Sequence, residues 1–551
     1  QITTTDNANI LQLEYDEVVI DDCGATGTDY IPFQFKPTTV GQWSTTVTIK
    51  DPKTGINVPV TIKANVTEAE VFVFETEGDW TTADNWNVGV VPGPNNDVLI
   101  KADVNIVGDV SIKSMAISED KTVTVKVTGK LQVTQPSASS EKGNLILDAK
   151  LGNKDQQGAS GQIVGAENLK IQDAYFRMTF DPSGQITYGW YDFVVPFEVN
   201  IEDGIFREGN LTNSLQNGVD FIVMEHSETA RAAGKKDWKV ISGTMYPGKV
   251  YTITFDNEVL QNTFLFKKKE SAILGGSNSF SAVCSAKGEK ENRGWNGLGN
   301  GTLQHKQLSN NGKKVQMYDH TNNIYLTKEA DEYIFAVGTS FFMQVEAAQE
   351  ISFAAATNRP LLAPNHEARK TDEFRLALTA EGDRVTDYMW VSASEEATNE
   401  YAIGHDLLKM GTPTEAKVAQ MWALKGKNNL CDIELPLVQE NAYTPLSLFA
   451  PKAGTFTLTI EKMPADTKLF LTYEGNIIWD LTADAYTLDL KKGVTNNYGL
   501  LLEVNNAPQI STGVEQNQNN SKQATKVMIN NQLYIITSNG AIYSVTGKKV
   551  Q

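Results

Sequence analysis

The strongest constraint in this sequence is an alternation of apolar and polar residues with a period of two. It is clearest in residues 123–127 (VTVKV), 251–255 (YTITF) and 455–460 (TFTLTI). Successive side chains of an extended chain point to opposite faces, so this pattern places the apolar side chains on one face of a strand. Turn residues such as Pro247-Gly248 separate the runs. The pattern therefore predicts many short strands joined by turns.

Helical periodicity is rare in this chain. The best candidate is residues 413–424 (PTEAKVAQMWAL), which can equally be read as a loop that leads into a strand. A chain of many strands and few helices buries its sheets against each other. We therefore expect an all-β protein of tandem β-sandwich domains, immunoglobulin-like or jelly-roll-like, with a short β-solenoid segment.

The length of 551 residues is too great for a single hydrophobic core, and an apolar content of 40% is enough for several. Changes in pattern and composition divide the chain. The expected segments are 1–68, an immunoglobulin-like β-sandwich that is N-terminally truncated; 69–175, a short β-solenoid-like region; 176–365, a β-sandwich; 366–505, a second β-sandwich; 506–525, a polar linker; and 526–551, a C-terminal hairpin.

The solenoid expectation rests on strand length. The alternating runs between 69 and 175 are very short, as in 104–106, 110–112 and 115–117. Strands this short cannot bury a sandwich face alone, whereas coils stacked on one another can. A run of ordinary sandwich strands is the alternative.

Trp80 and Trp86 bracket a polar turn at the start of the solenoid segment. Stacked indoles could hold a sugar ring, which makes these two the candidate ligand-binding residues. In the alternative interpretation, each Trp caps the open end of the solenoid and covers its first coil. The remaining clusters of aromatic residues are more simply core.

Charge excludes several classes of partner. Lys and Arg number 48 against 67 Asp and Glu, which gives a formal net charge of −19. This sign opposes binding to nucleic-acid phosphates and to anionic lipid headgroups, so no nucleic-acid partner is expected.

No run approaches the roughly 18 apolar residues of a membrane-spanning helix. Cys23, Cys284 and Cys431 are too sparse for a disulfide framework, although any two of them could pair.

The sequence offers no convincing catalytic site, no metal site and no cofactor motif. No His-x-x-x-His, Glu-x-x-His or Cys-x-x-Cys pair supports zinc, and the five histidines are His226, His305, His320, His366 and His405. Cys284 with His305 or His320 could be drawn as a thiol protease, but a lone Cys in a β-domain is usually a small buried hydrophobe. Acidic loops leave room for an incidental calcium ion, at Asp21-Asp22, Glu202-Asp203 and Asp383.

A series of motifs follows a recognisable order. GDW (78–80), DNW (84–86) and VPGPNNDVLI (91–100) come first; WYDFVVPFEV, GWNGLGN and FFMQV follow, and then TPLSLFAPKAGTFTLTI, IIWDLTADAYTL, YGLLLEV and the tail LYIITSNGAIYSVTGKKV. In this order they resemble large exported surface proteins of the Bacteroidota, the group that uses the type IX secretion system. The order, more than any single motif, carries the resemblance.

The resemblance implies a secreted or cell-surface location and a C-terminal tail that engages the secretion and surface-anchoring machinery. It also implies that His405-Asp406 with Lys409 lies in a structural motif and serves packing and loop pinning. The tail lacks the Tyr-Pro-Asn-Pro entry of the fuller sorting domain, so it resembles a partial version. Asn496-Asn497-Tyr498 also stands where an Arg-Phe pair is usual.

These observations together predict a non-catalytic secreted or cell-surface scaffold, adhesin-like, that forms the C-terminal part of a larger exported polypeptide. Its partners would be glycans or other surface proteins, recognised by loops at the ends of the sandwiches. The alternative is an accessory region, glycan-binding or spacer, of a secreted carbohydrate-active enzyme or peptidase.

Overall fold

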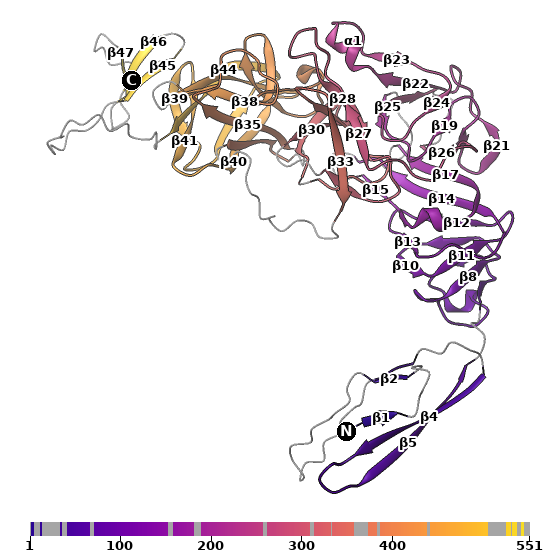
Figure 1. The fold of residues 1–551 in the computed structure, drawn as a ribbon. Coiled ribbons are helices and arrows are strands. Elements are labelled where there is room, and N and C mark those ends of the chain that lie inside the picture. Colours follow the sequence, from indigo (N-terminus) through magenta and orange to yellow (C-terminus); the bar gives the residue numbers. More distant parts are fainter. Residues whose placement is uncertain are drawn as a thin grey trace.

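The structure is a computed structural model and describes residues 2–4, 11–13, 33–35, 41–66, 71–152, 158–180, 189–256, 262–308, 313–331, 333–356, 373–382, 386–437, 441–504, 525–529, 532–536 and 542–544. These residues form 47 strands, one short α-helix, α1 (Glu228–Ala232), and 3-10 turns at Ala83–Asn85, Ala166–Asn168 and Pro413–Glu415. The expected all-β class is confirmed (Figure 1). None of the described helices is long and apolar enough to cross a membrane.

The first region contains a long hairpin. Its strands β4 (Gly41–Lys50) and β5 (Asn57–Val66) pair along their whole length, and Asp51 caps their turn by accepting a 2.9 Å hydrogen bond from the Lys53 backbone N–H. The other strands here are β1 (Ile2–Thr4), which pairs with β4, and β2 (Leu11–Leu13), which pairs with β3 (Phe33–Phe35). The rest of the expected immunoglobulin-like module lies outside the described residues.

The second region is a three-sided parallel β-solenoid. Its strands form three parallel stacks: β6 (Phe72–Phe74), β8 (Asp97–Ile100) and β11 (Ser114–Ile117); β7 (Gly78–Asp79), β9 (Val104–Ile106), β12 (Thr122–Val125), β14 (Gly143–Lys150) and β17 (Ile171–Thr179); and β10 (Asp109–Ile112), β13 (Lys130–Val133) and β16 (Gln162–Val164). A short antiparallel strand, β15 (Ala159–Ser160), pairs with β14. The parallel pairing excludes a run of ordinary sandwich strands.

Stacking of like residues holds the solenoid coils together. Val104, Val123, Leu145 and Ala174 are register partners on successive coils, and each of them is buried. Burial of each valine or leucine side chain in such a stack contributes about 1.5–3 kcal/mol. The corners between coils demand glycine: a Cβ on Gly129 would lie 2.1 Å from the Ile106 carbonyl oxygen, so no larger residue fits there.

The solenoid continues into the first sandwich without a break. Strand β17 pairs with β26 (Thr263–Lys267), which pairs with β20 (Ile205–Arg207) and, through it, with β21 (Asn210–Ser214). One hydrophobic core extends from Phe74 to Phe266. The boundary expected between residues 175 and 176 therefore falls inside a strand that belongs to both regions.

The first sandwich contains several small antiparallel sheets. One has the order β18 (Tyr191–Phe193), β25 (Tyr251–Phe255), β22 (Phe221–His226) and β23 (Trp238–Val240), and β19 (Val199–Asn200) pairs with β24 (Thr244–Met245). A second has the order β28 (Trp295–Gly299), β32 (Ser340–Gln344), β30 (Lys314–Asp319) and β31 (Ile324–Glu329). A third has the order β27 (Ser279–Ala282), β33 (Gln349–Ala355) and β29 (Lys306–Leu308).

The last sandwich is a single curled sheet around its own core. Its strands follow the order β42 (Asn476–Asp480), β41 (Thr467–Tyr473), β44 (Gly493–Val504), β39 (Asn441–Ala450), β37 (Gln420–Lys425), β38 (Asn428–Pro436), β35 (Thr386–Ser394), β34 (Glu373–Ala380), β40 (Gly454–Lys462) and β43 (Tyr486–Leu490), with β36 (Leu407–Leu408) beside β38. The helix considered for 413–424 is wrong. A 3-10 turn leads there into β37, as the loop alternative proposed.

The C-terminal strands form a small antiparallel meander of β45 (Thr525–Ile529), β46 (Gln532–Ile536) and β47 (Ile542–Ser544). The pairing of β46 with β47 confirms the expected hairpin. Its Asn539-Gly540 turn lies outside the described residues.

Candidate functional site

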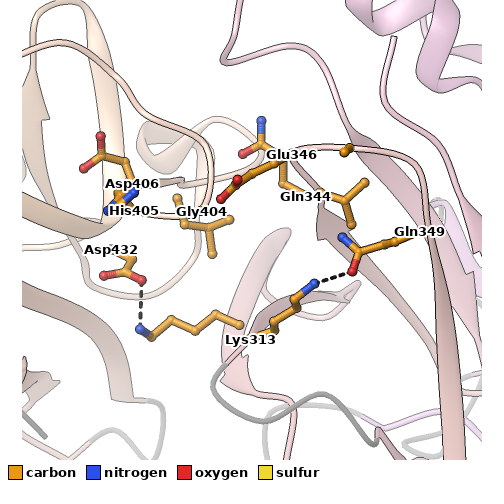
Figure 2. A pocket seen from close by; sticks show the side chains of 12 residues that line it. Lys313, Gln344, Glu346, Gln349, Gly404, His405, Asp406 and Asp432 are labelled. Carbon is orange, nitrogen blue, oxygen red and sulfur yellow. Dashed lines mark hydrogen bonds and ion pairs between the residues drawn. The ribbon is translucent and has the colours of Figure 1, made fainter. Parts of the chain in front are cut away.

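A polar groove lies where the first sandwich meets the last one (Figure 2). Its volume is about 430 Å³. One wall comes from the start of β30 and the turn after β32, and it carries Lys313, Glu346 and Gln349. The other wall comes from the loop before β36 and carries Gly404, His405 and Asp406. This groove is the candidate site because it gathers titratable side chains from both sandwiches.

Two buried ion pairs hold the wall of the last sandwich. The Lys425 ammonium lies 2.8 Å from Asp406, whose carboxylate also accepts hydrogen bonds from the backbone N–H groups of Ala402 and Glu434. The Lys409 ammonium lies 2.6 Å from Asp387. Burial raises the pKa of both carboxyls, although the lysines work against the rise. These contacts are of the kind expected if Asp406 and Lys409 pin the loop.

His405 is the one groove residue with the setting of a proton carrier. Its Nδ1 contacts the buried carboxylate of Glu434, and about half of its side chain is exposed. A histidine oriented in this way can move a proton if a reacting group lies beside it. The twelve residues that line the groove include no hydroxyl and no thiol. The groove can therefore bind polar groups, and its lining offers His405 no hydroxyl or thiol to activate.

An ion network crosses from one sandwich to the other. The Lys314 ammonium lies 3.0 Å from Glu373 and 2.8 Å from Asp432, and 5.0 Å from the centre of the Trp390 ring. Burial disfavours the charged amine, but Asp432 and Glu373 outweigh it and raise the pKa of Lys314. The Trp390 indole N–H donates to Glu329 at 2.8 Å, back across the same junction.

Gln316 makes further hydrogen bonds between the first sandwich and the last. Its side-chain amide contacts the Leu408 carbonyl, and its carbonyl oxygen accepts a 2.8 Å hydrogen bond from the Met410 N–H. An apolar layer surrounds these contacts and consists of Val194, Val250, Trp295, Phe342, Leu407, Met410 and Cys431. The sheet of β28, β32, β30 and β31 is thereby buried on both faces, with its own sandwich core on the opposite side.

The cysteines and histidines do not form the thiol-protease pair considered from the sequence. The His305 ring nitrogen lies 3.0 Å from the Ser160 carbonyl, and His320 packs on Tyr191. Burial raises the pKa of the Cys284 thiol, which disfavours a thiolate. Cys284 and Cys431 are both unpaired, and Cys23 lies outside the described residues.

The structure describes one of the three acidic loops considered for an incidental calcium ion. Within the described part of the chain, no three His, Cys, Asp or Glu side chains are grouped so that they could hold an ion. Glu202 and Asp203 are exposed at the turn after β19. The other loops proposed for incidental calcium, Asp21-Asp22 and Asp383, lie outside the described residues.

The structure places Trp80 and Trp86 inside the first solenoid coil. Their exposed fractions are 1% and 3%, their rings meet at 4.7 Å, and the Trp86 indole N–H donates to the Trp80 carbonyl. Phe74 packs edge-on against Trp86. Rings buried in this way have no open face for a sugar, so the contacts favour the capping interpretation.

Sequence reasoning missed one unusual group, Asp192. It lies in the middle of the apolar run 190–197, and its side chain is buried. Its strand partner is Thr252, whose hydroxyl interacts with the Asp192 carboxyl and opposes the effect of burial on the pKa of Asp192. Burial raises the pKa of Asp192 to about 7. The signal that could have identified Asp192 in the sequence is a charged residue inside an otherwise apolar strand.

Comparison with known proteins identifies no relative: no family model, no curated protein and no solved structure matches this chain.

Proposed function

We propose that this protein is a non-catalytic secreted or cell-surface scaffold, adhesin-like in character, within a larger exported polypeptide. The observation that supports this best is the continuity of packing from the solenoid to the last sandwich. One core spans the solenoid and the first sandwich, and Lys314, Gln316 and an apolar layer join the first sandwich to the last. Such packing suits a stiff body that carries loops away from a surface.

The placement of charged groups also supports a scaffold over an enzyme. Asp406, Asp387 and Asp432 each face a lysine at short distance. Groups paired in this way fix geometry and are not free to exchange protons with a substrate. The secretion machinery as partner of the C-terminal strands, and the surface location, belong to the same proposal.

Stiffness can be measured directly. Spin labels on cysteines that replace Val107 in the solenoid and Met463 in the last sandwich, both exposed, would report the distance between the regions by pulsed electron paramagnetic resonance. Cys23 and Cys284 are replaced by serine in this background. We expect one narrow distance distribution, and a broader one when Lys314→Ala and Gln316→Ala are combined. A broad distribution in the parent protein would contradict the proposal.

Catalysis is tested in parallel with fluorogenic peptides and chromogenic glycosides. We expect no turnover by the purified protein. Turnover that is lost in a His405→Ala variant, with its fold intact by circular dichroism, would replace the scaffold proposal with an enzyme that uses the groove.

The alternative, an accessory region of a secreted carbohydrate-active enzyme or peptidase, is favoured by one observation. Aromatic side chains are exposed at one end of the last sandwich, where Tyr473 and Trp479 lie. Exposed aromatic rings are a common means of holding polysaccharide beside a catalytic domain.

A further inference from the structure

Four aromatic side chains gather where the core of the last sandwich ends. Tyr473, Trp479, Tyr486 and Tyr498, the aromatic rim, lie on β41, β42, β43 and β44. Tyr473 and Tyr498 are register partners, and Trp479 is the partner of the core residue Leu471. Because residues two apart on a strand share a face, the rim continues the inner face of the sheet beyond the core.

The rings of the rim meet in two pairs, and in each pair one ring is exposed (Tyr473, Trp479) while the other is half-buried against the core (Tyr498, Tyr486). The Tyr473 and Tyr498 ring centres are 5.1 Å apart, and those of Trp479 and Tyr486 are 5.5 Å apart. Trp479 is 39% exposed, and it is the only exposed tryptophan of the nine, all of which the structure describes. The Trp479–Tyr486 contact joins β42 and β43, the two end strands of the sheet. Two aliphatic side chains could join these strands equally well, so the closure of the sheet does not by itself explain why aromatic rings stand here.

Fixed polar groups surround the rim. The Trp479 indole N–H donates to the Asp484 carbonyl at 3.0 Å, which holds the ring in one orientation. The Asn497 side-chain amide lies 3.3 Å from the Glu474 carboxylate and 3.5 Å from the Tyr473 hydroxyl. Glu474 and Gly475 both have positive φ, of 49° and 79°, as the two central residues of a tight hairpin turn require.

We propose that the aromatic rim, with Glu474 and Asn497, binds a neutral oligosaccharide. Aromatic faces carry partial negative charge and attract the C–H groups of a pyranose ring, while carboxylate and amide groups at the edge meet its hydroxyls. The carboxylates of Glu474 and Asp480, in a protein of charge −19, repel uronate and sialylated glycans. This inference rests on the adhesive part of the proposed function and names its ligand class.

The test is binding of the full chain to neutral hexasaccharides. Cellohexaose, laminarihexaose, maltohexaose, mannohexaose and chitohexaose are titrated in turn, with hexagalacturonate as the anionic comparison, by calorimetry and by acrylamide quenching of tryptophan fluorescence. We expect at least one neutral sugar to bind and to protect Trp479 from quenching. Trp479→Ala should weaken that binding at least tenfold, and Trp479→Phe should weaken it less, because a ring face remains.

Tyr246→Ala is the matched control, because Tyr246 is 48% exposed on the other sandwich and should leave binding unchanged. Absence of binding to every neutral hexasaccharide at millimolar concentration would overturn the inference, and so would an equal loss in the Trp479→Ala and Tyr246→Ala variants. Tighter binding of hexagalacturonate would also overturn it. A failure here leaves the spin-label result intact, so the scaffold and the sugar site are judged separately.

Discussion

The solenoid and the junction between the sandwiches are both tightly packed, but they are held by different chemistry. In the solenoid, apolar residues stack on like residues of the next coil, as Val104, Val123 and Leu145 do. At the junction, buried ions and amides make the decisive contacts, as Lys314 and Gln316 do. The difference teaches that a regular repeat relies mainly on burial, whereas buried polar contacts specify the joint between unlike surfaces.

The two regions also differ in how far apart their partners lie in the chain. Hydrogen bonds between solenoid coils join residues close in the chain, for example 19 positions apart for Thr122 and Asp103 and 21 positions apart for Thr128 and Val107. The Lys314–Asp432 contact spans 118 positions, and the Met410–Gln316 contact spans 94. The contacts within the solenoid therefore depend on residues close together in the chain. The contacts at the junction form only when distant parts of the chain have folded.

The largest effect is expected from leaving a buried charge unpaired. Lys425→Met removes the cation beside Asp406 and should cost about 3–5 kcal/mol locally. Hydrogen exchange of peptides that cover β36 to β38 would measure this loss. Lys427→Met is the control, because that lysine is 77% exposed and should cost less than about 1 kcal/mol. Equal effects of the two variants would mean that the buried pair does not hold the loop.

Truncation of the solenoid core should have the next largest effect. Leu147→Ala leaves a cavity among stacked coils and should cost about 3 kcal/mol. Because no charge is involved, the loss should not change between pH 5 and pH 8 or with salt. Urea unfolding, followed by exchange of peptides in β12 to β14, would measure it. The control is Val107→Ala at an exposed solenoid position.

The same contrast explains what could be predicted from the sequence. The all-β fold class, the solenoid and the loop alternative for residues 413–424 could be predicted, because short alternating runs and turn residues are local signals in the sequence. The junction was not, since nothing near Lys314 or Gln316 indicates a partner about a hundred residues away. The exposure of Trp479 could not be predicted either, because it depends on which strands end the sheet. The burial of Trp80 and Trp86 agrees with the capping interpretation, which the sequence had offered beside the sugar-binding one.

The buried carboxyl of Asp192 should make the first sandwich sensitive to pH. Its pKa of about 7 in the folded protein lies above the ordinary 3.8, so the folded state binds more protons between these values and loses stability as pH rises. From pH 5 to pH 7 the loss is about 2–3 kcal/mol, at 1.36 kcal/mol per unit. Thermal unfolding across this range would measure it. Asp192→Asn should remove the dependence, and an unchanged slope in that variant would assign it to another group.

The smallest effect is expected from the surface ion pair of the solenoid. Lys113 lies 2.9 Å from Asp97, and both side chains are more than a third exposed. Although burial opposes it, Lys113 and Ser114 lower the pKa of Asp97, so the stabilisation is present near neutral pH and is lost as pH falls through that lowered pKa. Lys113→Ala should therefore cost less than about 1 kcal/mol in urea unfolding at pH 7.

The cost of Lys113→Ala should vanish in 1 M salt, where the screening length is about 3 Å. The Lys425→Met loss should survive the same salt, because solvent ions do not reach a pair as buried as Lys425 and Asp406. Salt thus separates an exposed ion pair of the solenoid from a buried ion pair of the last sandwich in a single measurement. If both losses disappeared together, the Lys425–Asp406 pair would behave as a surface pair, and the contrast between exposed and buried ion pairs would fail.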